Sequence, residues 1–340
     1  MTRLRKIGSK FVAVAAVVIS LVFAGILVSM TGESPLAAYK ALFQGAFGSL
    51  YSIKQTIRFA TPLMLVALSF SICKRSGYFN IGQDAQIYMS ALAATWVCLT
   101  WTSGPAWLRL IVAILAAIAT AAVCSSIPAI LKVLIDVDEV ILAFMFNYIV
   151  GLFTSYALLY SPIADTNSSS AVSLPINPSL YAPEIGRTGM SMWLIVAVAA
   201  IVFYGLWMRV TVPGYRMRMT GLNKRFAAYG GIDTRKTMVM SALLGGAFSG
   251  LAAAGEILGI YHIYFDKFSP GLGFNGIAAA LLGNHTPVGI ALGSLFLGAL
   301  QSGSVQMSVV TEVPAELVLV VQALVMFFAT ARRLGGGSRA

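Results

Sequence analysis

The sequence predicts an all-α protein that crosses a membrane many times, and two observations carry this prediction. Of the 340 residues, 58% are hydrophobic and only 10% are charged, whereas a soluble domain carries about 25% charged residues. The chain also contains repeated apolar runs that are long enough to cross a bilayer as helices. These runs are continuously apolar rather than alternating in polarity, so they are not strands of a membrane barrel. A soluble enzyme, a nucleic-acid-binding domain and a disordered chain are therefore excluded.

Charged residues delimit the candidate membrane spans. The stretch Phe268–Thr311 has 44 residues, which is too long for one helix, and Gly283–Pro287 interrupts it with helix-breaking residues. We divide it in two and expect about ten spans, some of them broken or re-entrant, in a single transmembrane domain of residues 1–340. The uncharged stretches, in chain order, are Phe11–Gly32, Phe59–Cys73, Ala85–Leu108, Leu110–Leu131, Ile141–Ala164, Thr188–Met208, Thr237–Gly255, Phe268–Thr311 and Leu317–Ala331.

The first of these stretches begins like a signal peptide, because Arg3, Arg5, Lys6 and Lys10 precede it. However, Phe11–Met30 is long enough to span the hydrocarbon core. No Ala-x-Ala-like cleavage site follows it. We therefore expect a retained first helix.

Lysine and arginine residues predict the orientation of the chain, because cytoplasmic loops of membrane proteins are enriched in them. With a cytoplasmic N-terminus, 17 of the 23 Lys and Arg residues fall on the cytoplasmic side and 6 fall outside. Ten spans also return the C-terminus, with Arg332 and Arg333, to the cytoplasmic side. Both termini are therefore expected in the cytoplasm.

Two long connections fall on opposite sides of the membrane in this topology. Residues 160–189 are polar, rich in Ser and Pro, and lie outside. Residues 208–236 lie in the cytoplasm and carry seven basic residues against one acid, Asp233. The orientation rule alone explains this charge. Alternatively, the apolar residues Phe226–Tyr229 belong to a short amphipathic helix that is presented to a cytoplasmic partner.

Two glycine-containing interruptions, one in each half of the chain, are candidate solute sites. Gly77–Asp84 and Gly271–Ile277 both place Phe-Asn beside glycine and isoleucine, 195 residues apart, which is a possible trace of an internal repeat. Glycine lets the backbone leave helical geometry. The amide groups that are freed need a polar cavity or a ligand, since lipid offers no partners. Interrupted helices in both halves are typical of transporter binding sites.

Aromatic and amide side chains at these interruptions suit a small polar solute with a flat ring. Phe79 and Phe274 can stack on the ring, and Asn80 and Asn275 can hydrogen-bond to its edge. Packing between helices explains each Phe equally well, and an interhelical hydrogen bond explains each Asn equally well. An acid inside a span is a functional candidate, although Glu256, late in its span, can also simply reach solvent. The candidate substrate-binding residues are Phe79, Asn80, Asp84, Asn147, Glu256, Phe274 and Asn275.

Motifs for catalysis, metal binding and cofactor binding are missing from the sequence. There is no Gly-Lys dipeptide, hence no P-loop, and no nucleophile elbow or cofactor fingerprint occurs. We therefore expect no catalytic residue, no metal and no cofactor in this chain. A cytoplasmic ATPase on the basic loop is the expected energy source. The alternatives are a secondary transporter that uses Asp84 and Glu256 as an ion site, and a structural membrane subunit of an energy-converting complex.

Four stretches of the chain carry a family resemblance. Phe79–Gln86 is similar to a Phe-Asn-Ile-Gly motif followed by an acid, a glycine and a glutamine, with Ala85 in place of the glycine. Glu139–Ile149 is similar to a Glu-Val and Met-Leu-Asn-Tyr-Ile pattern, Gly221–Ile232 to a cytoplasmic coupling segment, and Gly250–Gly283 to a C-terminal half. In this order they resemble the permease subunits of bacterial ABC importers of the branched-chain amino-acid/ribose permease superfamily. The simple-sugar and nucleoside branch is the most similar one.

The resemblance implies a permease like those of type II ABC importers, in the bacterial inner membrane. It implies a second permease, usually in a heterodimer, a cytoplasmic ABC ATPase that binds ATP and Mg, and an extracytoplasmic substrate-binding protein, with no nucleic acid. Nucleosides are the implied substrate, and sugars such as ribose or galactose come next. The residues implied to couple the chain to the ATPase are Gly221, Asn223, Ala227, Ala228 and Gly231.

Overall fold

A computed structural model describes residues 22, 25, 26, 28–30, 32–168, 170–186, 189–311, 320 and 323. In these residues the regular structure is helical, and β structure is limited to isolated bridges. The predicted all-α fold is therefore confirmed. The expected span at Leu317–Ala331 and most of that at Phe11–Gly32 lie outside the described residues.

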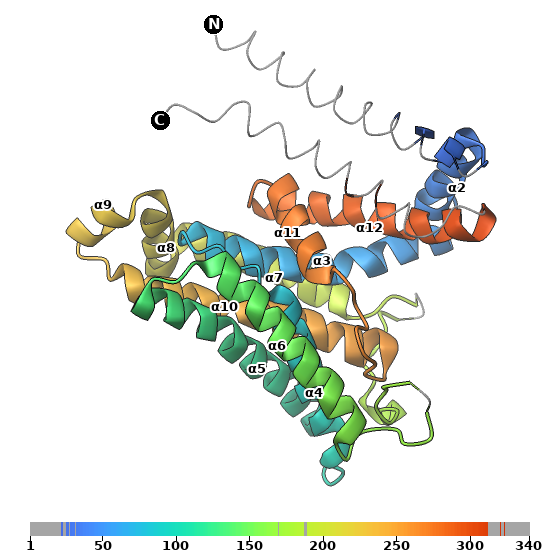
Figure 1. The fold of residues 1–340 in the computed structure, drawn as a ribbon, viewed down its shortest axis with the longest axis horizontal. Helices are drawn as coiled ribbons and strands as arrows, with labels where there is room; N and C mark the ends of the chain where they lie inside the picture. The colour runs from blue at the N-terminus through green and yellow to red at the C-terminus, as the bar shows by residue number, and fades with distance from the viewer. Residues whose placement is uncertain are drawn as a thin grey trace, which may run out of the picture. The chain divides into compact units, whose positions relative to one another are not determined.

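The helices of the described residues follow one another along the chain as drawn in Figure 1. Their bounds are α2 Pro35–Phe47, α3 Leu50–Arg75, α4 Gln83–Thr100, α5 Ala106–Ile135, α6 Glu139–Tyr160, the 3₁₀ turn η1 Pro178–Leu180, α7 Trp193–Val210, α8 Val212–Leu222, α9 Lys224–Tyr229, α10 Thr234–Glu256, the π-helical turn η2 Ile257–Tyr261, α11 Leu272–Leu282 and α12 Pro287–Val310.

The chain divides into two units, Met1–Ala60 with Leu295–Ala340, and Thr61–Ser294. In the first unit, α2 packs on the last part of α12, where the Ser302 hydroxyl donates to the Gly45 carbonyl at 2.7 Å. Lys40 divides the apolar residues of α2, so no span is predicted there from the sequence. The expectation of a single domain over residues 1–340 stays a prediction.

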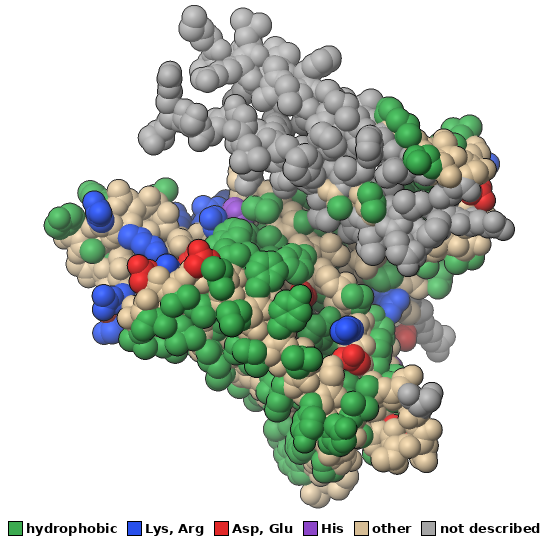
Figure 2. Space-filling model, viewed as in Figure 1, with side chains coloured by type: hydrophobic (Ala, Val, Ile, Leu, Met, Phe, Trp, Pro, Cys, Tyr) green, Lys and Arg blue, Asp and Glu red, His purple; other side chains and the backbone are tan. Residues whose placement is uncertain are grey.

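In the second unit α4, α5 and α10 pack on one another, and the part of α3 from Leu63 to Cys73 is buried as well. Small residues allow α5 and α10 to approach closely, because a Cβ on Gly250 would lie 2.6 Å from the Ala117 carbonyl oxygen. Close approach through small residues is typical of helices that pack inside a membrane, where burial of apolar surface gives little driving force. The outer helices are less covered, and only 17% of the apolar window of α6 is buried. Figure 2 shows that hydrophobic side chains cover much of the face of the second unit that is turned to the viewer.

Six helices in the described ranges are long and apolar enough to cross a membrane, namely α3, α5, α6, α7, α10 with its π-helical extension, and α12. The predicted division of Phe268–Thr311 is confirmed, since α11 ends at Leu282 and α12 begins at Pro287. However, α11 has 11 residues, whereas a span needs about 17–25. The first half of the divided stretch is therefore shorter than a full span in the structure, and the total of about ten spans is not confirmed. A half-length helix does agree with the expected broken or re-entrant helices.

The two long connections lie at opposite ends of the second unit (Figure 1). At one end, α8 and α9 accompany the C-termini of α3, α5 and α7, and Lys and Arg side chains gather there (Figure 2). At the other end, the connection after α6 pairs with the segment after η2. Its Ser173 N–H donates to the Tyr264 carbonyl at 2.7 Å, and its Ile176 N–H donates to the His262 carbonyl at 2.9 Å.

Candidate functional site

A cleft of about 480 Å³ opens between α4, α6 and the segment that leads into α11. Three of the predicted substrate-binding residues, Asp84, Asn147 and Phe274, line it. All of its walls belong to the second unit. Pockets with a few polar groups among apolar and aromatic side chains are the usual form of a small-molecule site.

The first interruption, between α3 and α4, is held closed by Asn80. This side chain is 1% exposed, and its Nδ2 donates to the Ser125 hydroxyl at 3.2 Å. Its Oδ1 accepts from the Gly82 N–H at 3.0 Å and from the Gln86 amide at 3.2 Å. Asn80 therefore satisfies polar groups within the protein, and it does not line the cleft.

Asn147 reaches the same interruption from α6. Its Oδ1 accepts from the Ala85 N–H at 3.0 Å, and its Nδ2 donates to the Ile81 carbonyl at 3.2 Å. These are backbone groups that the start of a helix leaves without intrahelical partners. Asn147 thus fixes the start of α4 while it also forms part of the cleft wall.

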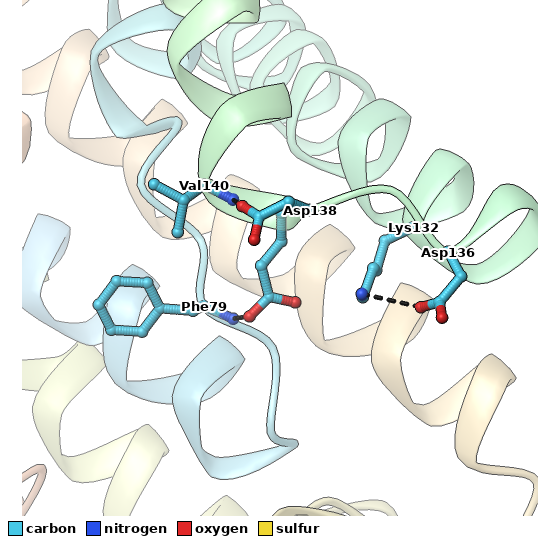
Figure 3. Close-up of polar contacts among 6 residues, drawn as sticks. Phe79, Lys132, Asp136, Asp138 and Val140 are labelled. Atoms are coloured by element: carbon cyan, nitrogen blue, oxygen red, sulfur yellow. Dashed lines mark hydrogen bonds and ion pairs between the residues drawn. The ribbon is translucent and has the colours of Figure 1, made fainter.

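Phe79 points away from the cleft, and its backbone is tied to α6. Its N–H donates to Glu139 Oε1 at 3.0 Å (Figure 3). Its ring makes an edge contact with Phe70, with centroids 5.2 Å apart, and lies 4.8 Å from the Lys74 ammonium. Glu139 is not among the site residues predicted from the sequence, although the Glu-Val pair that begins α6 belongs to one of the stretches that carry the family resemblance.

The polar contacts around Glu139 order the turn between α5 and α6. The Asp138 carboxylate accepts from the Val140 N–H at 2.8 Å and caps α6, as in Figure 3. Lys132 pairs with Asp136 at 2.8 Å, and this hydrogen bond lowers the pKa of Asp136.

The second interruption, before α11, opens onto the cleft. Gly271 has φ +74°, a conformation that glycine adopts without strain, and it ends the preceding loop. Asp84 in the first turn of α4 accepts from the Gly273 N–H at 2.9 Å, so one carboxylate joins the starts of α4 and α11. Phe274 is 45% exposed and stacks on Phe144 of α6, with centroids 6.0 Å apart.

Asn275 and Glu256 do not line the cleft. Asn275 is half-buried in the first turn of α11. Glu256 is 6% exposed at the end of α10, where the π-helical turn begins, so it does not reach solvent. The structure therefore brings three of the seven predicted residues together in one cavity. Among the described residues, no group of His, Cys, Asp and Glu could hold a metal ion.

The cleft also contains residues that the sequence analysis missed. Ser155 donates to Asp266 Oδ1 at 2.7 Å, and the Tyr88 hydroxyl donates to the Ser269 carbonyl at 3.3 Å. A signal for the α6 wall exists, because Asn147, Gly151 and Ser155 recur every four residues within an otherwise apolar helix. No comparable local pattern indicates Asp266, which joins Ser155 across 111 residues of chain.

The predicted coupling segment forms α8 and α9. Asn223 caps α9 by accepting from the Phe226 N–H at 3.0 Å, and Gly231, at φ +77°, follows the helix. Ala227 is fully buried, whereas Ala228 is exposed. The short helix expected at Phe226–Tyr229 is thus present. Its exposed apolar side chains include Leu222, Phe226 and Tyr229, which are 80%, 64% and 92% exposed.

Arg75, the last residue of α3, lies between this segment and the end of α11. A Cβ on Gly221 would overlap the Arg75 carbonyl oxygen, so α8 packs directly on the α3 backbone. The Arg75 guanidinium donates to the His285 carbonyl at 3.2 Å, and Tyr204 donates to the same oxygen at 2.8 Å. The turn between α11 and α12 is therefore bonded to the residue on which α8 packs.

Interrupted helices around a polar cleft, in a chain with several membrane-crossing helices, define a membrane permease as the class of protein. The chain belongs to the family described as branched-chain amino acid transport system / permease component, which matches residues 52–330. The family resemblance drawn from the four sequence stretches is thereby confirmed. Permease subunits of ABC transporters are not themselves enzymes, and in general they act with an ATPase and a substrate-binding protein.

Three relatives match nearly the whole chain. The guanosine ABC transporter permease protein NupP of Bacillus subtilis (strain 168) is 33% identical over 95% of this chain and 94% of NupP. The nucleoside ABC transporter permease protein NupB of Lactococcus lactis subsp. cremoris (strain MG1363) is 28% identical over 93% of this chain and 89% of NupB. The glucose ABC transporter permease protein TsgB13 of Haloferax volcanii is 31% identical over 93% of this chain and 85% of TsgB13. A second guanosine permease protein of Bacillus subtilis, NupQ, is 26% identical over 74% of this chain and 81% of NupQ.

Proposed function

We propose that this protein is the translocation subunit of an ATP-driven ABC importer that moves nucleosides across the bacterial inner membrane. The observation that carries the proposal is the cleft at the second interruption, where a stacked aromatic pair, Phe144 and Phe274, lies beside Asp84 and Asn147. A flat, apolar surface suits a nucleobase, and the polar groups suit its sugar. The relatives named for guanosine and nucleosides support the same substrate class.

A sugar is the second candidate substrate. The glucose permease protein TsgB13 covers the chain almost as fully as the two nucleoside relatives do. Sugars also stack on aromatic rings, so the cleft is compatible with both. The nucleoside is preferred as the substrate because the relatives named for guanosine and nucleosides match the chain over a larger share of their own length.

The energy source in this proposal is a partner ATPase that binds ATP and Mg on the cytoplasmic side, with no cofactor in this chain. The exposed apolar side chains of α8 and α9 supply the docking surface, and the basic residues around them support a cytoplasmic location. Both chain termini then lie in the cytoplasm. An ion-coupled mechanism is less favoured because only Asp84 of the Asp84–Glu256 pair lines the cleft.

A second, related permease completes the transmembrane core in this proposal. The resemblance of this chain to both NupP and NupQ, two guanosine permease proteins of one organism, supports such a pairing. The outer surface of α6 is largely uncovered and apolar, as expected of a helix that faces lipid or another subunit.

Narrowing the cleft at Gly151 tests the proposal. A Cβ here meets nothing within 4 Å, so Gly151→Phe fills the cleft without a clash in the backbone of α6. Ile149→Phe is the matched control, because Ile149 is 60% exposed on the same helix and lines a separate apolar groove. Both variants are assembled with the ATPase, the second permease and the binding protein in proteoliposomes, and ATP-driven guanosine uptake is measured.

We expect Gly151→Phe to abolish uptake and Ile149→Phe to retain it. Equal uptake by the two variants would exclude the cleft as the route. Uptake by the unsubstituted complex that persists without ATP and collapses with the proton gradient would instead establish the secondary transporter. Uptake of glucose but not guanosine would establish the sugar permease.

A further inference from the structure

The lining of the cleft includes two carboxylates, those of Asp84 and Asp266, and each uses only one of its oxygens in a hydrogen bond within the described residues. Asp84 accepts the Gly273 N–H through Oδ1, and Asp266 accepts the Ser155 hydroxyl through Oδ1. Within the described part of the chain, no hydrogen bond reaches the second oxygen of either group. A carboxylate can accept several hydrogen bonds, so each group retains acceptor capacity that faces a cavity.

These contacts also fix the direction of the two carboxylates. The Asp84 side chain is held between the first turns of α4 and α11, where a Cβ on Gly273 would lie 2.6 Å from its Oδ1. Asp266 Oδ1 accepts from the Ser155 hydroxyl of α6 at 2.7 Å, a distance typical of a charge-assisted hydrogen bond. Acceptors that are fixed before the ligand arrives do not lose side-chain entropy on binding.

The charge of the cleft selects against anions. Its wall contains the carboxylates of Asp84 and Asp266 and one ammonium, that of Lys267. The lining therefore carries net negative charge, and like charges brought together in a site of reduced dielectric repel strongly. A neutral solute with several hydroxyl donors fits this wall, whereas a phosphorylated one does not.

We infer that Asp266, oriented by Ser155, together with Asp84 accepts hydrogen bonds from the sugar hydroxyls of a neutral ribonucleoside whose base lies along Phe144 and Phe274, and that the same carboxylates exclude nucleotides. This inference rests on the proposed function and names the part of the substrate that this chain reads. Asp266 is a specificity-determining residue in this scheme, and Ser155 is a positioning residue.

The inference predicts discrimination at the sugar. A site built to hydrogen-bond a hydroxyl rejects an analogue that lacks it, because its polar groups are then left unpaired. The permease should therefore transport guanosine faster than 2′,3′-dideoxyguanosine. Losing the Asp266 charge should reduce this preference and admit more guanosine monophosphate.

The test measures the ratio of guanosine uptake to 2′,3′-dideoxyguanosine uptake in proteoliposomes that contain the complete complex. Asp266→Asn, Ser155→Ala and the control Ile149→Ala are compared with the unsubstituted chain. Because the binding protein is identical in all four samples, any change in the ratio arises from this chain. Competition by guanosine monophosphate provides a second readout, and co-purification of the subunits verifies assembly.

We expect the ratio to fall about tenfold in Asp266→Asn, as for the loss of one charged hydrogen bond, and less in Ser155→Ala. Ile149→Ala should keep the ratio of the unsubstituted chain, and only Asp266→Asn should gain inhibition by the nucleotide. An unchanged ratio in Asp266→Asn, or an equal loss of both substrates in an assembled complex, overturns the inference. If Asp266→Asn does not assemble, an unchanged ratio in Ser155→Ala overturns it. Absence of guanosine uptake by the unsubstituted complex overturns the proposed function instead.

Discussion

The two interruptions share a Phe-Asn sequence but differ in almost every contact. Before α4, Asn80 is buried with its amide fully hydrogen-bonded, and the half-buried Phe79 packs on the buried Phe70. Before α11, Asn275 is half-buried and Phe274 faces the cleft. The same residue pair therefore closes one interruption and furnishes an open wall at the other.

The difference shows that neighbouring helices, rather than the motif, assign these roles. The first interruption meets α5 through Ser125 and α6 through Asn147 and Glu139, which accept the Ala85 and Phe79 N–H groups. The second begins with Gly271 in open space and meets a single charged partner, Asp84. The first interruption is closed by contacts within the protein, whereas the second borders the cleft in which we propose that the solute binds.

The largest effect is expected from removal of the amide that closes the first interruption. Asn80→Ala leaves the Ser125 hydroxyl, the Gly82 N–H and the Gln86 amide without their partner, at a cost of about 3 kcal/mol in the free energy of unfolding. Thermal unfolding in detergent measures this loss. Asn275→Ala is the matched control and should unfold within about 0.5 kcal/mol of the unsubstituted protein. If both variants lose the same free energy of unfolding, Asn80 does not hold the first interruption more firmly than Asn275 holds the second.

A smaller effect is expected when the link between the two interruptions is broken. Gly273→Ala forces its methyl group against Asp84 Oδ1 and should destabilise the protein by about 2 kcal/mol, as overpacking does. It should also reduce ATP-driven guanosine uptake, because it separates α11 from α4. Asp84→Asn keeps an oxygen that can accept the Gly273 N–H, so its unfolding temperature should stay near that of the unsubstituted protein. If Asp84→Asn lowers the unfolding temperature, the negative charge of Asp84 stabilises this region in addition to the hydrogen bond from Gly273.

The two phenylalanines should separate binding from stability. Phe274→Ala removes a stacking surface worth about 1–2 kcal/mol, which corresponds to a rise in the KM for guanosine of about fivefold to thirtyfold, with little change in unfolding. Phe79→Ala should lower the unfolding temperature and leave KM unchanged. Uptake kinetics and thermal unfolding of the same preparations decide this, and a raised KM in Phe79→Ala would contradict the assignment.

The smallest effect is expected at Glu139. Glu139→Ala removes the acceptor of the Phe79 N–H and should cost about 1 kcal/mol. Glu139→Gln retains a carbonyl oxygen at the same place and should recover most of that loss. If the two variants unfold alike, the contact in Figure 3 does not stabilise the first interruption.

The sequence located both interruptions, the division at Gly283–Pro287 and the short helix of the coupling segment, because glycine, proline and helix caps act locally. It did not distinguish the orientations of Phe79 and Phe274, since these depend on α5 and α6, which are remote in sequence. The pairing of Ser155 with Asp266 crosses 111 residues and leaves no local pattern. The apolar composition before Gly283 predicts a span but does not determine where the helix begins, and α11 begins only at Leu272.

Arg75 gives the molecule a mechanical property that follows from its two contacts. Its carbonyl is covered by Gly221 of α8 and its guanidinium binds the turn after α11, while Asp84 holds the other end of α11. One residue therefore connects α8 with the turn that ends α11. Both ends of α11 are therefore held, and its 11 residues extend over about 16 Å, so a displacement at one end must be taken up by the contact at the other.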